Sequence, residues 1–247
     1  MSYEQSIHLR PTAPLAERVL LPGDPGRALA LAQTLLAGPR MFNHNRGLWG
    51  YTGAAPDGQP LTIQATGMGG PSAAIVLAEL AWLGARRAIR VGTCGALSAE
   101  LALGELVIAD EAICADGTSL ALGAGARVRA DPVLTDALRR SAQSARAGAV
   151  VSVDLFYETG VAGAPGRGAG APGRGAGART RHADALAVEM EAAPLFAAGA
   201  RNGMQVACVL AVTDVFDAHD ARTRIDEHAL LAAAERMGRA ALVALSG

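Results

Sequence analysis

Three carboxylates interrupt apolar stretches of this 247-residue chain, and carboxylates in such places can do chemistry. Glu189 and Glu191 lie in the stretch AVEMEAA, and Asp214 ends the stretch VACVLAVTD. A buried carboxylate is costly unless it accepts hydrogen bonds. The glutamates could accept from two vicinal hydroxyls of a sugar, and Asp214 could act as a general acid. The alternatives are an exposed first helical turn for the glutamates and a helix or turn cap for Asp214.

Four turns that follow apolar strands point to a binding site. They are Gly23-Asp24-Pro25, Gly67-Met68-Gly69-Gly70, Gly92-Thr93-Cys94-Gly95 and the strand end at Thr213-Asp214. In an open α/β sheet, ligands bind at the carboxyl ends of strands, where glycine lets the backbone approach an anion. Arg27 follows the first turn and Arg90 precedes the third, so two guanidinium groups could converge on one oxyanion.

Charge and composition exclude several classes of function. All 22 basic residues are arginine, so the chain lacks both a Schiff-base lysine and a P-loop lysine. The net charge of −1 argues against a nucleic-acid or anionic-membrane surface. A polar start and the lack of a long apolar run predict a cytoplasmic protein with no signal peptide and no membrane span. Three scattered cysteines, Cys94, Cys114 and Cys208, predict neither a disulfide framework nor a zinc site, and we expect buried thiols.

A seven-residue unit, GAPGRGA, occurs twice and begins a third time across residues 163–178. Glycine and arginine also build phosphate sites, so the repeat could in principle hold an anion. It has no apolar side chain larger than Ala or Pro, so packing cannot easily offset the entropy of ordering so much glycine. We therefore predict a flexible insertion at about 160–181 rather than an anion site.

Alternating strands and helices must position these groups. Strands are predicted at Val19–Leu21, on both sides of Asp57-Gly58, and in AIRVGTCGAL (breaking at its glycines), GELVIADEAIC, AVVSVDLF and QVACVLAVTD. Helices are predicted from Pro25, from Pro71 to about Gly84, from Pro132 after an N-cap at Asp131, in EMEAAPLFAAGAR and over the last twenty-odd residues. The pattern indicates an α/β fold with a largely buried sheet. Because no linker divides residues 1–247, we predict one domain.

Seven phrases together resemble the nucleoside phosphorylase family that includes hexameric purine nucleoside phosphorylases and uridine phosphorylases. In the family's order they are VLLPGDPGRA, NRGLWGYTG, TGMGGPSAA, IRVGTCGAL, DLFY, VEMEAA and AVTD. They span about Val19 to Asp214, which is most of the chain. The resemblance implies a three-layer α/β/α fold with a central mixed β-sheet flanked by helices. It also implies phosphorolysis of nucleosides to free base and (deoxy)ribose 1-phosphate, in nucleoside salvage or catabolism.

The resemblance also implies roles for individual residues. The phosphate site would comprise Gly23, Arg27, Arg90 and Thr93, with Arg46 from a neighbouring subunit. The nucleoside site would comprise Met68, Phe156, Glu189, Met190 and Glu191, with His8 from a neighbouring subunit. Asp214 would protonate the purine at N7, assisted by Arg224 or Arg222, which the spacing does not separate. Inorganic phosphate would be a co-substrate with no metal or cofactor, and the protein would be a dimer-based homo-oligomer such as a hexamer.

Two features favour a purine as the base. An aspartate at 214 suits N7 protonation, and no Gln lies between FY and EME, where uridine phosphorylases use one to recognise the pyrimidine. The sequences of the segments RVGTCGAL and GGPSAA resemble the uridine phosphorylases more closely, so uridine phosphorylase is the alternative. A nucleosidase is less favoured, because Arg27 and Arg90 imply an anion to hold. A non-catalytic nucleoside-binding protein is also less favoured.

Overall fold

The computed structural model describes residues 6–157, 182–217 and 221–247. Its strands are β1 (Arg18–Leu21), β2 (Ala37–Asn43), β3 (Gly50–Ala54), β4 (Pro60–Gln64), β5 (Arg87–Ala96), β6 (Leu106–Ala115), β7 (Arg127–Arg129), β8 (Arg146–Val153), β9 (Ala187–Glu189), β10 (Gln205–Phe216) and β11 (Arg222–Arg224). Its helices are α1 (Pro25–Leu35), the short 3₁₀ helix η2 (Asn45–Gly47), α2 (Gly70–Leu83), α3 (Gly117–Ala121), α4 (Pro132–Ser141), α6 (Ala192–Asn202) and α7 (Glu227–Ser246). The predicted insertion at about 160–181 lies outside the described residues.

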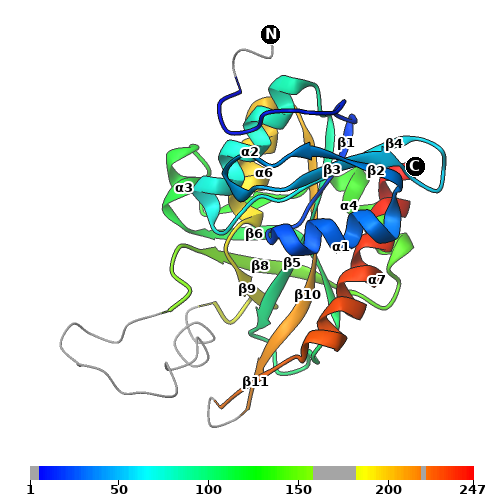
Figure 1. Cartoon of the computed structure of the whole chain (residues 1–247). Coiled ribbons are helices and arrows are strands. Elements are labelled where there is room, and N and C mark those ends of the chain that lie inside the picture. The colour runs from blue at the N-terminus through cyan, green and yellow to red at the C-terminus, as the bar shows by residue number, and fades with distance from the viewer. Residues whose placement is uncertain (1–5, 158–181, 218–220) are drawn as a thin grey trace, which may run out of the picture.

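Five strands form a closed circuit at the centre of the sheet (Figure 1). β5 pairs with β10 in parallel, β10 with β6 antiparallel, β6 with β8 and β8 with β9 in parallel, and β9 returns to β5 antiparallel. From β5 the sheet continues through β1, β4, β3 and β2, while β11 forms a hairpin with β10. Both parallel and antiparallel pairs occur, so the predicted mixed sheet is confirmed.

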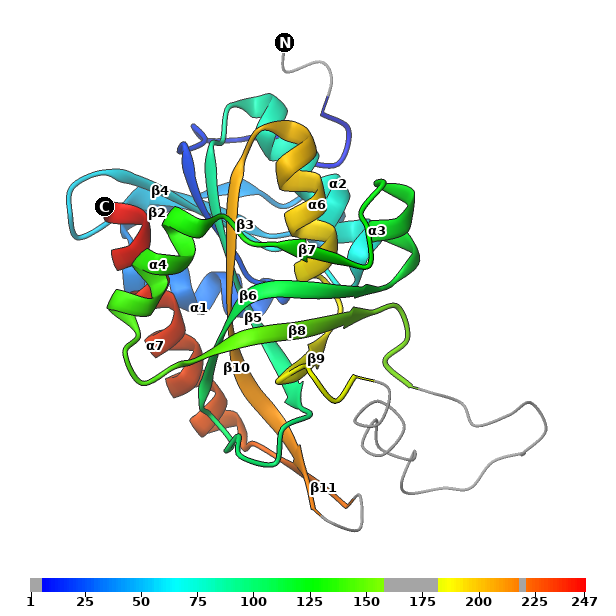
Figure 2. The same cartoon turned by 180° about the vertical axis from the view of Figure 1, so that it is seen from behind.

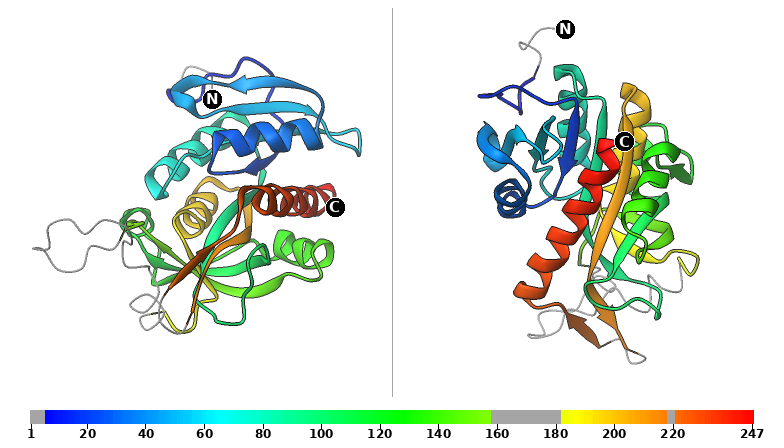
Figure 3. Two further views of the ribbon diagram at one scale, coloured as in Figure 1. Left: turned by 60° about the horizontal axis from the view of Figure 1, so that its bottom comes forward. Right: turned by 90° about the vertical axis from the view of Figure 1, so that its right-hand side faces the viewer.

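Helices cover both faces of this sheet, and alternate strand residues meet opposite faces. Val19 and Leu21 of β1 belong to the core that includes α2 and α6, whereas Leu20 packs with α1, α4 and α7. Figure 2 shows α2 and α6 side by side, and the right-hand view of Figure 3 shows α7 running along β10. The three-layer α/β/α arrangement expected from the resemblance is confirmed. No helix in the described ranges is long and apolar enough to cross a membrane.

Most helix starts and turns follow the predicted local signals. Asp24 caps α1 by accepting the N–H of Arg27 at 2.7 Å, and Asp131 caps α4 by accepting the N–H of Leu134 at 2.9 Å. Gly84 ends α2 with a φ of 115°, a conformation that favours glycine. The hairpin predicted around Asp57 and Gly58 is the antiparallel pair β3–β4.

Two predicted boundaries are wrong. β5 continues through its glycines, because β10 pairs with it from Arg87 to Gly95, with Leu210 opposite Gly92 and one register shift between Val212 and Asp214. The EME segment is not helical either: Glu189 ends strand β9, and α6 begins at Ala192. In both places, pairing with a distant strand overrides the local preference for a turn or helix.

Candidate active site

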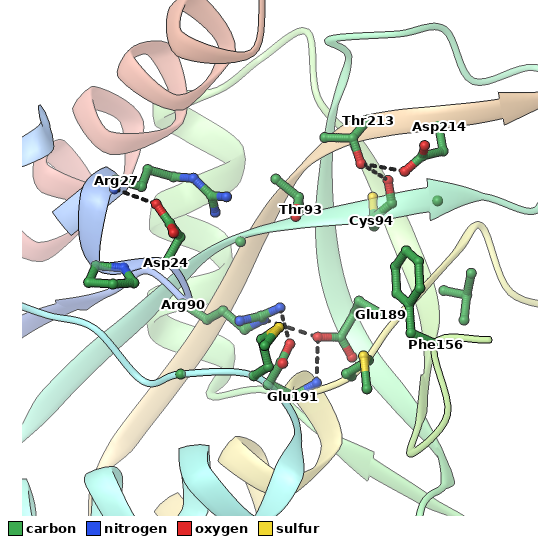
Figure 4. Close-up of a pocket in the computed structure, with 18 residues that line it drawn as sticks. Asp24, Arg27, Arg90, Thr93, Cys94, Phe156, Glu189, Glu191, Thr213 and Asp214 are labelled. Carbon is green, nitrogen blue, oxygen red and sulfur yellow. Dashed lines mark hydrogen bonds and ion pairs between the residues drawn. The ribbon is translucent and has the colours of Figure 1, made fainter. Parts of the chain in front are cut away.

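A pocket of about 370 Å³ lies at one edge of the sheet. Because β1, β4, β5 and β10 run parallel, their carboxyl ends meet at that edge. The pocket is lined by Gly23, Asp24, Pro25, Arg27, Gly67, Met68, Arg90, Gly92, Thr93, Cys94, Gly95, Phe156, Val188, Glu189, Met190, Glu191, Thr213 and Asp214 (Figure 4). All four turns singled out in the sequence reach it. The structure therefore gathers in one place residues that lie up to 191 positions apart in the chain (from Gly23 to Asp214).

One end of the pocket is cationic. The guanidinium groups of Arg27 and Arg90 line it together with Thr93 and the backbone of Gly23. Arg27 makes no side-chain hydrogen bond or ion pair within the described ranges, and Nη1 of the buried Arg90 has no hydrogen-bond partner there. Burial lowers the pKa of Arg27, and repulsion from Arg90 acts in the same direction against the attraction of Asp24. An oxyanion held between the two arginines would offset both effects.

Arg90 also bridges two glutamates. Its Nε lies 3.0 Å from Oε2 of Glu189, and its Nη2 lies 2.5 Å from Oε2 of Glu191. Burial alone would lower the pKa of Arg90, but the carboxylates of Glu191 and Glu189 outweigh it and raise that pKa. The backbone N–H of Gly69 donates to Oε1 of Glu191 at 2.5 Å. Both glutamates are buried, so the alternative of an exposed first turn is wrong.

The start of α6 holds Glu189 in place. Its Oε2 accepts the N–H of Ala192 at 2.9 Å, and Ser152 donates its hydroxyl to Oε1 at 2.5 Å. The same Ser152 oxygen accepts the N–H of Ala193 at 2.9 Å. Burial raises the pKa of Glu189, against the attraction of Arg90. Sequence reasoning missed Ser152, whose signal is a lone hydroxyl in the apolar strand AVVSVDLF.

Asp214 lies in the pocket wall beside Phe156, well away from Arg27 (Figure 4). Its Oδ1 accepts a hydrogen bond from Nε of Arg222 at 2.7 Å and lies 2.6 Å from Nη2 of the same side chain in an ion pair, whereas Nη1 of Arg224 is 4.0 Å away. The guanidinium of Arg222 also lies over the Phe156 ring, 5.7 Å from its centroid. Of the two arginines left open by the sequence, Arg222 is the one that holds the aspartate.

The second oxygen of Asp214 contacts a hydroxyl. Oδ2 is 2.8 Å from Oγ1 of Thr213, and that hydroxyl is also 3.1 Å from the carbonyl oxygen of Cys94. When Oδ2 carries a proton, it can donate to Thr213 while Thr213 donates to the carbonyl. The site can therefore hold the carboxyl group both with and without its proton.

The pocket wall also contains a thiol that is not activated. Burial raises the pKa of Cys94, and it raises that of Cys208 behind the wall as well. A protonated thiol is a poor nucleophile. Cys94 and Cys208 are therefore the buried small side chains that the sequence predicts, whereas Cys114 is only partly buried.

Besides Arg222 and Arg224, two predicted site residues, His8 and Arg46, lie outside the lining of this pocket in the single subunit. His8 is held by Glu79 of α2, with its Nδ1 2.7 Å from a carboxylate oxygen of Glu79. Arg46 lies exposed in η2 with φ 58° and ψ 20°, a left-handed conformation that is costly for a residue with a side chain. Among the described residues it is the only non-glycine with positive φ. Both residues are thus presented on the surface rather than to the pocket of their own chain.

Comparison with known proteins identifies the family. The profile of the Phosphorylase superfamily matches residues 17–246. The chain belongs to this superfamily. It is 31% identical over 209 residues to a DeoD-type purine nucleoside phosphorylase of Oceanobacillus iheyensis, covering 81% of this chain and 83% of that one. It is 33% identical over 218 residues to a DeoD-type enzyme of Alkaliphilus metalliredigens, covering 85% and 87%.

A solved phosphorylase structure has the same fold. The crystal structure of a uridine phosphorylase from Vibrio fischeri, complexed with 6-hydroxy-1-naphthoic acid, aligns with a TM-score of 0.75 at 25% identity. The alignment covers 94% of this chain and 90% of that one. The chain is therefore an enzyme of the nucleoside phosphorylase family, and the family predicted from the sequence phrases is confirmed. Enzymes of this family transfer pentosyl groups between small molecules. The matched relatives include both purine and uridine enzymes.

Proposed function

We propose that this phosphorylase transfers the ribosyl or deoxyribosyl group of a purine nucleoside to inorganic phosphate and releases the free base, in nucleoside salvage or catabolism. The observation that carries the proposal is the order of groups in one pocket. Arg27 and Arg90 line one end of the pocket, Glu191 lies beside Arg90, and Asp214, which Arg222 binds, lines the wall away from Arg27 (Figure 4). A nucleoside and phosphate need this order, because the sugar lies between the attacking oxygen and the departing base.

The cationic end suits phosphate as nucleophile. Arg27, Arg90, Thr93 and the backbone of Gly23 would bind its oxygens, and arginine remains charged at any physiological pH. The C1′–N bond breaks through a transition state in which positive charge grows on the sugar. A phosphate dianion held beneath it stabilises this charge and forms the new bond to C1′. The proposal assigns no metal or cofactor, and phosphate is a co-substrate.

Glu191 and Asp214 would act on the two halves of the nucleoside. Glu191 would accept hydrogen bonds from the 2′- and 3′-hydroxyls, with Glu189, Met68 and Met190 around the sugar. Asp214 would protonate N7 of the purine as negative charge grows on the base beside Phe156, and general acid catalysis of this kind contributes about 10²–10⁴-fold. Oδ1 is already held by Arg222, so Oδ2 is the oxygen that would carry the proton.

We further propose that the active unit contains at least two subunits, arranged as a dimer-based oligomer such as a hexamer. Arg46 would complete the phosphate site of a neighbour, and His8 would approach the 5′-hydroxyl of its ribose. The strained backbone of Arg46 and its exposed position outside the lining of its own pocket support this assignment. Ile75 and Trp82 on the outer face of α2 are exposed in the single subunit, as expected for a surface that another subunit covers.

A substrate panel tests the proposal. Initial rates with inosine, guanosine, adenosine and uridine, each with and without phosphate, should give phosphate-dependent release of purines at the highest kcat/KM. Uridine phosphorylase is the second candidate, because the matched crystal structure is of that activity. If uridine is the best substrate, the enzyme is a uridine phosphorylase. Release of the free base without phosphate would indicate a nucleosidase. If no nucleoside is cleaved but nucleosides bind, the chain is a non-catalytic binding protein.

A further inference from the structure

We propose that Glu79 is a positioning residue that fixes which nitrogen of His8 can accept a hydrogen bond. The inference rests on the proposed function, in which His8 meets the ribose of a neighbouring subunit. It is carried by the contacts of Glu79, a buried carboxylate on α2 outside the pocket described above.

Three backbone N–H groups and one ring nitrogen from one short segment converge on this carboxylate. Oε1 accepts the backbone N–H of Ile7 at 3.1 Å and lies 2.7 Å from Nδ1 of His8. Oε2 accepts the backbone N–H groups of His8 at 3.1 Å and of Leu9 at 2.7 Å. A buried carboxylate is tolerated when it is hydrogen-bonded in this way.

The same contacts keep the carboxylate ionised. Burial acts to raise the pKa of Glu79, but the hydrogen bonds from Leu9 and His8 outweigh it, and the pKa is lowered. An ionised carboxylate can only accept, so the hydrogen of a neutral imidazole must be on Nδ1 of His8. Nε2 is then left as the acceptor, and it makes no hydrogen bond to any residue in the described part of the chain. It is therefore available to a hydroxyl group.

A second contact ties His8 to the turn that carries Arg46. The side-chain amide of Asn45 donates to the carbonyl of His8 at 2.9 Å, and Asn45 directly precedes Arg46. The backbone of His8 is therefore held by Glu79 on one side and by this turn on the other, and the imidazole itself is held through Nδ1. Its side chain remains 29% exposed, which leaves room for contact from outside the subunit.

The expected ligand of Nε2 is the 5′-hydroxyl of a nucleoside bound in the adjacent subunit. A hydroxyl donates to the lone pair of Nε2 without any change in charge. Glu79→Gln places an amide beside Nδ1, and its N–H₂ group favours the other tautomer, in which Nε2 carries the hydrogen. The 5′-hydroxyl then loses Nε2 as its acceptor. The preference of the enzyme for a nucleoside with a 5′-hydroxyl over one with a 5′-methyl group should therefore fall.

The test compares inosine with 5′-deoxyinosine in phosphate-dependent kinetics. The wild-type enzyme should prefer inosine in kcat/KM by about 3- to 10-fold or more, the value of one hydrogen bond. Both His8→Ala and Glu79→Gln should reduce this ratio to near one, and the double variant should match His8→Ala. Ser6→Ala is the matched control: it removes a 2.7 Å bond from the Ser6 hydroxyl to the Leu9 carbonyl in the same segment and should keep the ratio.

Two results would overturn the inference. One is that Glu79→Gln slows both substrates equally and keeps the ratio, as expected of a purely structural residue. The other is that Glu79→Gln changes the ratio when His8 is already alanine. If Glu79→Gln does not fold, Glu79→Asp keeps the charge but withdraws the carboxylate by one methylene from Nδ1, so it weakens the contact that fixes the tautomer and should also lower the ratio. A wild-type enzyme that cleaves no nucleoside would instead refute the proposed function, and the inference with it.

Discussion

Replacing Arg222 by glutamine should slow the chemical step, and replacing Arg224 should not. The two residues are two positions apart on β11, so their side chains leave the same face of the strand. Arg224 is the direct cross-strand partner of Asp214, yet it is Arg222 that binds Oδ1 of the aspartate through two nitrogens. The pair therefore provides a test and its own control.

The size of the effect follows from the contacts. Hydrogen bonds to a charged group contribute about 1.5–3 kcal/mol, and each 1.4 kcal/mol is tenfold, so Arg222→Gln should lower kcat/KM for inosine about 10- to 100-fold. When the proton leaves Asp214, the carboxylate becomes charged, and Arg222 stabilises that product of the transfer. The side chain of Arg224 is 61% exposed and 4.0 Å from Asp214, so Arg224→Gln should cost less than about 5-fold.

The assay compares inosine with 7-methylguanosine, whose base already carries a positive charge and needs no proton at N7. With 7-methylguanosine, the kcat/KM of Arg222→Gln should be within about 3-fold of the wild-type value, because the proton transfer that Arg222 assists is not needed. Equal losses for the two arginine variants would refute the assignment of Arg222. An undiminished defect on 7-methylguanosine would show that Arg222 acts on something other than the proton.

Three further variants test other parts of the site and fold. Arg27→Gln should raise the KM for phosphate at least tenfold with little change in the KM for inosine; a larger change for inosine would argue against a phosphate role. Ser152→Ala leaves Glu189 with one donor fewer and should lower the free energy of unfolding by about 1–3 kcal/mol, measured by urea denaturation; no loss would contradict its role. Hydrogen bonds from Arg18, with one from Ser246, lower the pKa of Asp57, so its stabilising effect is present above about pH 4 and is lost as pH falls below that value. The difference in Tm between wild type and Asp57→Asn should therefore shrink between about pH 5 and pH 2, and a constant difference would refute this.

Local signals in the sequence predict much of the fold. Asp24 and Asp131 begin helices because a side-chain oxygen satisfies a free N–H at each start, and these contacts need no knowledge of the rest of the chain. The turns at the ends of β1, β4, β5 and β10 could also be assigned to one site in advance, because parallel strands bring their carboxyl ends together.

What could not be predicted depends on contacts between distant segments. Strand β9 is three residues long and exists because β5 and β8 pair with it, so Glu189 was expected in a helix. Ser152 gains its role only when β8 brings its hydroxyl to the start of α6. Which of Arg222 and Arg224 contacts Asp214 depends on how their side chains lie across the hairpin, and the spacing of the two residues in the sequence does not determine this.

The central claim is that phosphate, rather than water, attacks the sugar. The most direct test is ³¹P NMR of a reaction of inosine with inorganic phosphate, followed until the base is released. A ribose 1-phosphate signal should appear in equal amount to hypoxanthine, and no base should be released when phosphate is omitted. Release of hypoxanthine at the same rate without phosphate, with no sugar phosphate formed, would contradict it.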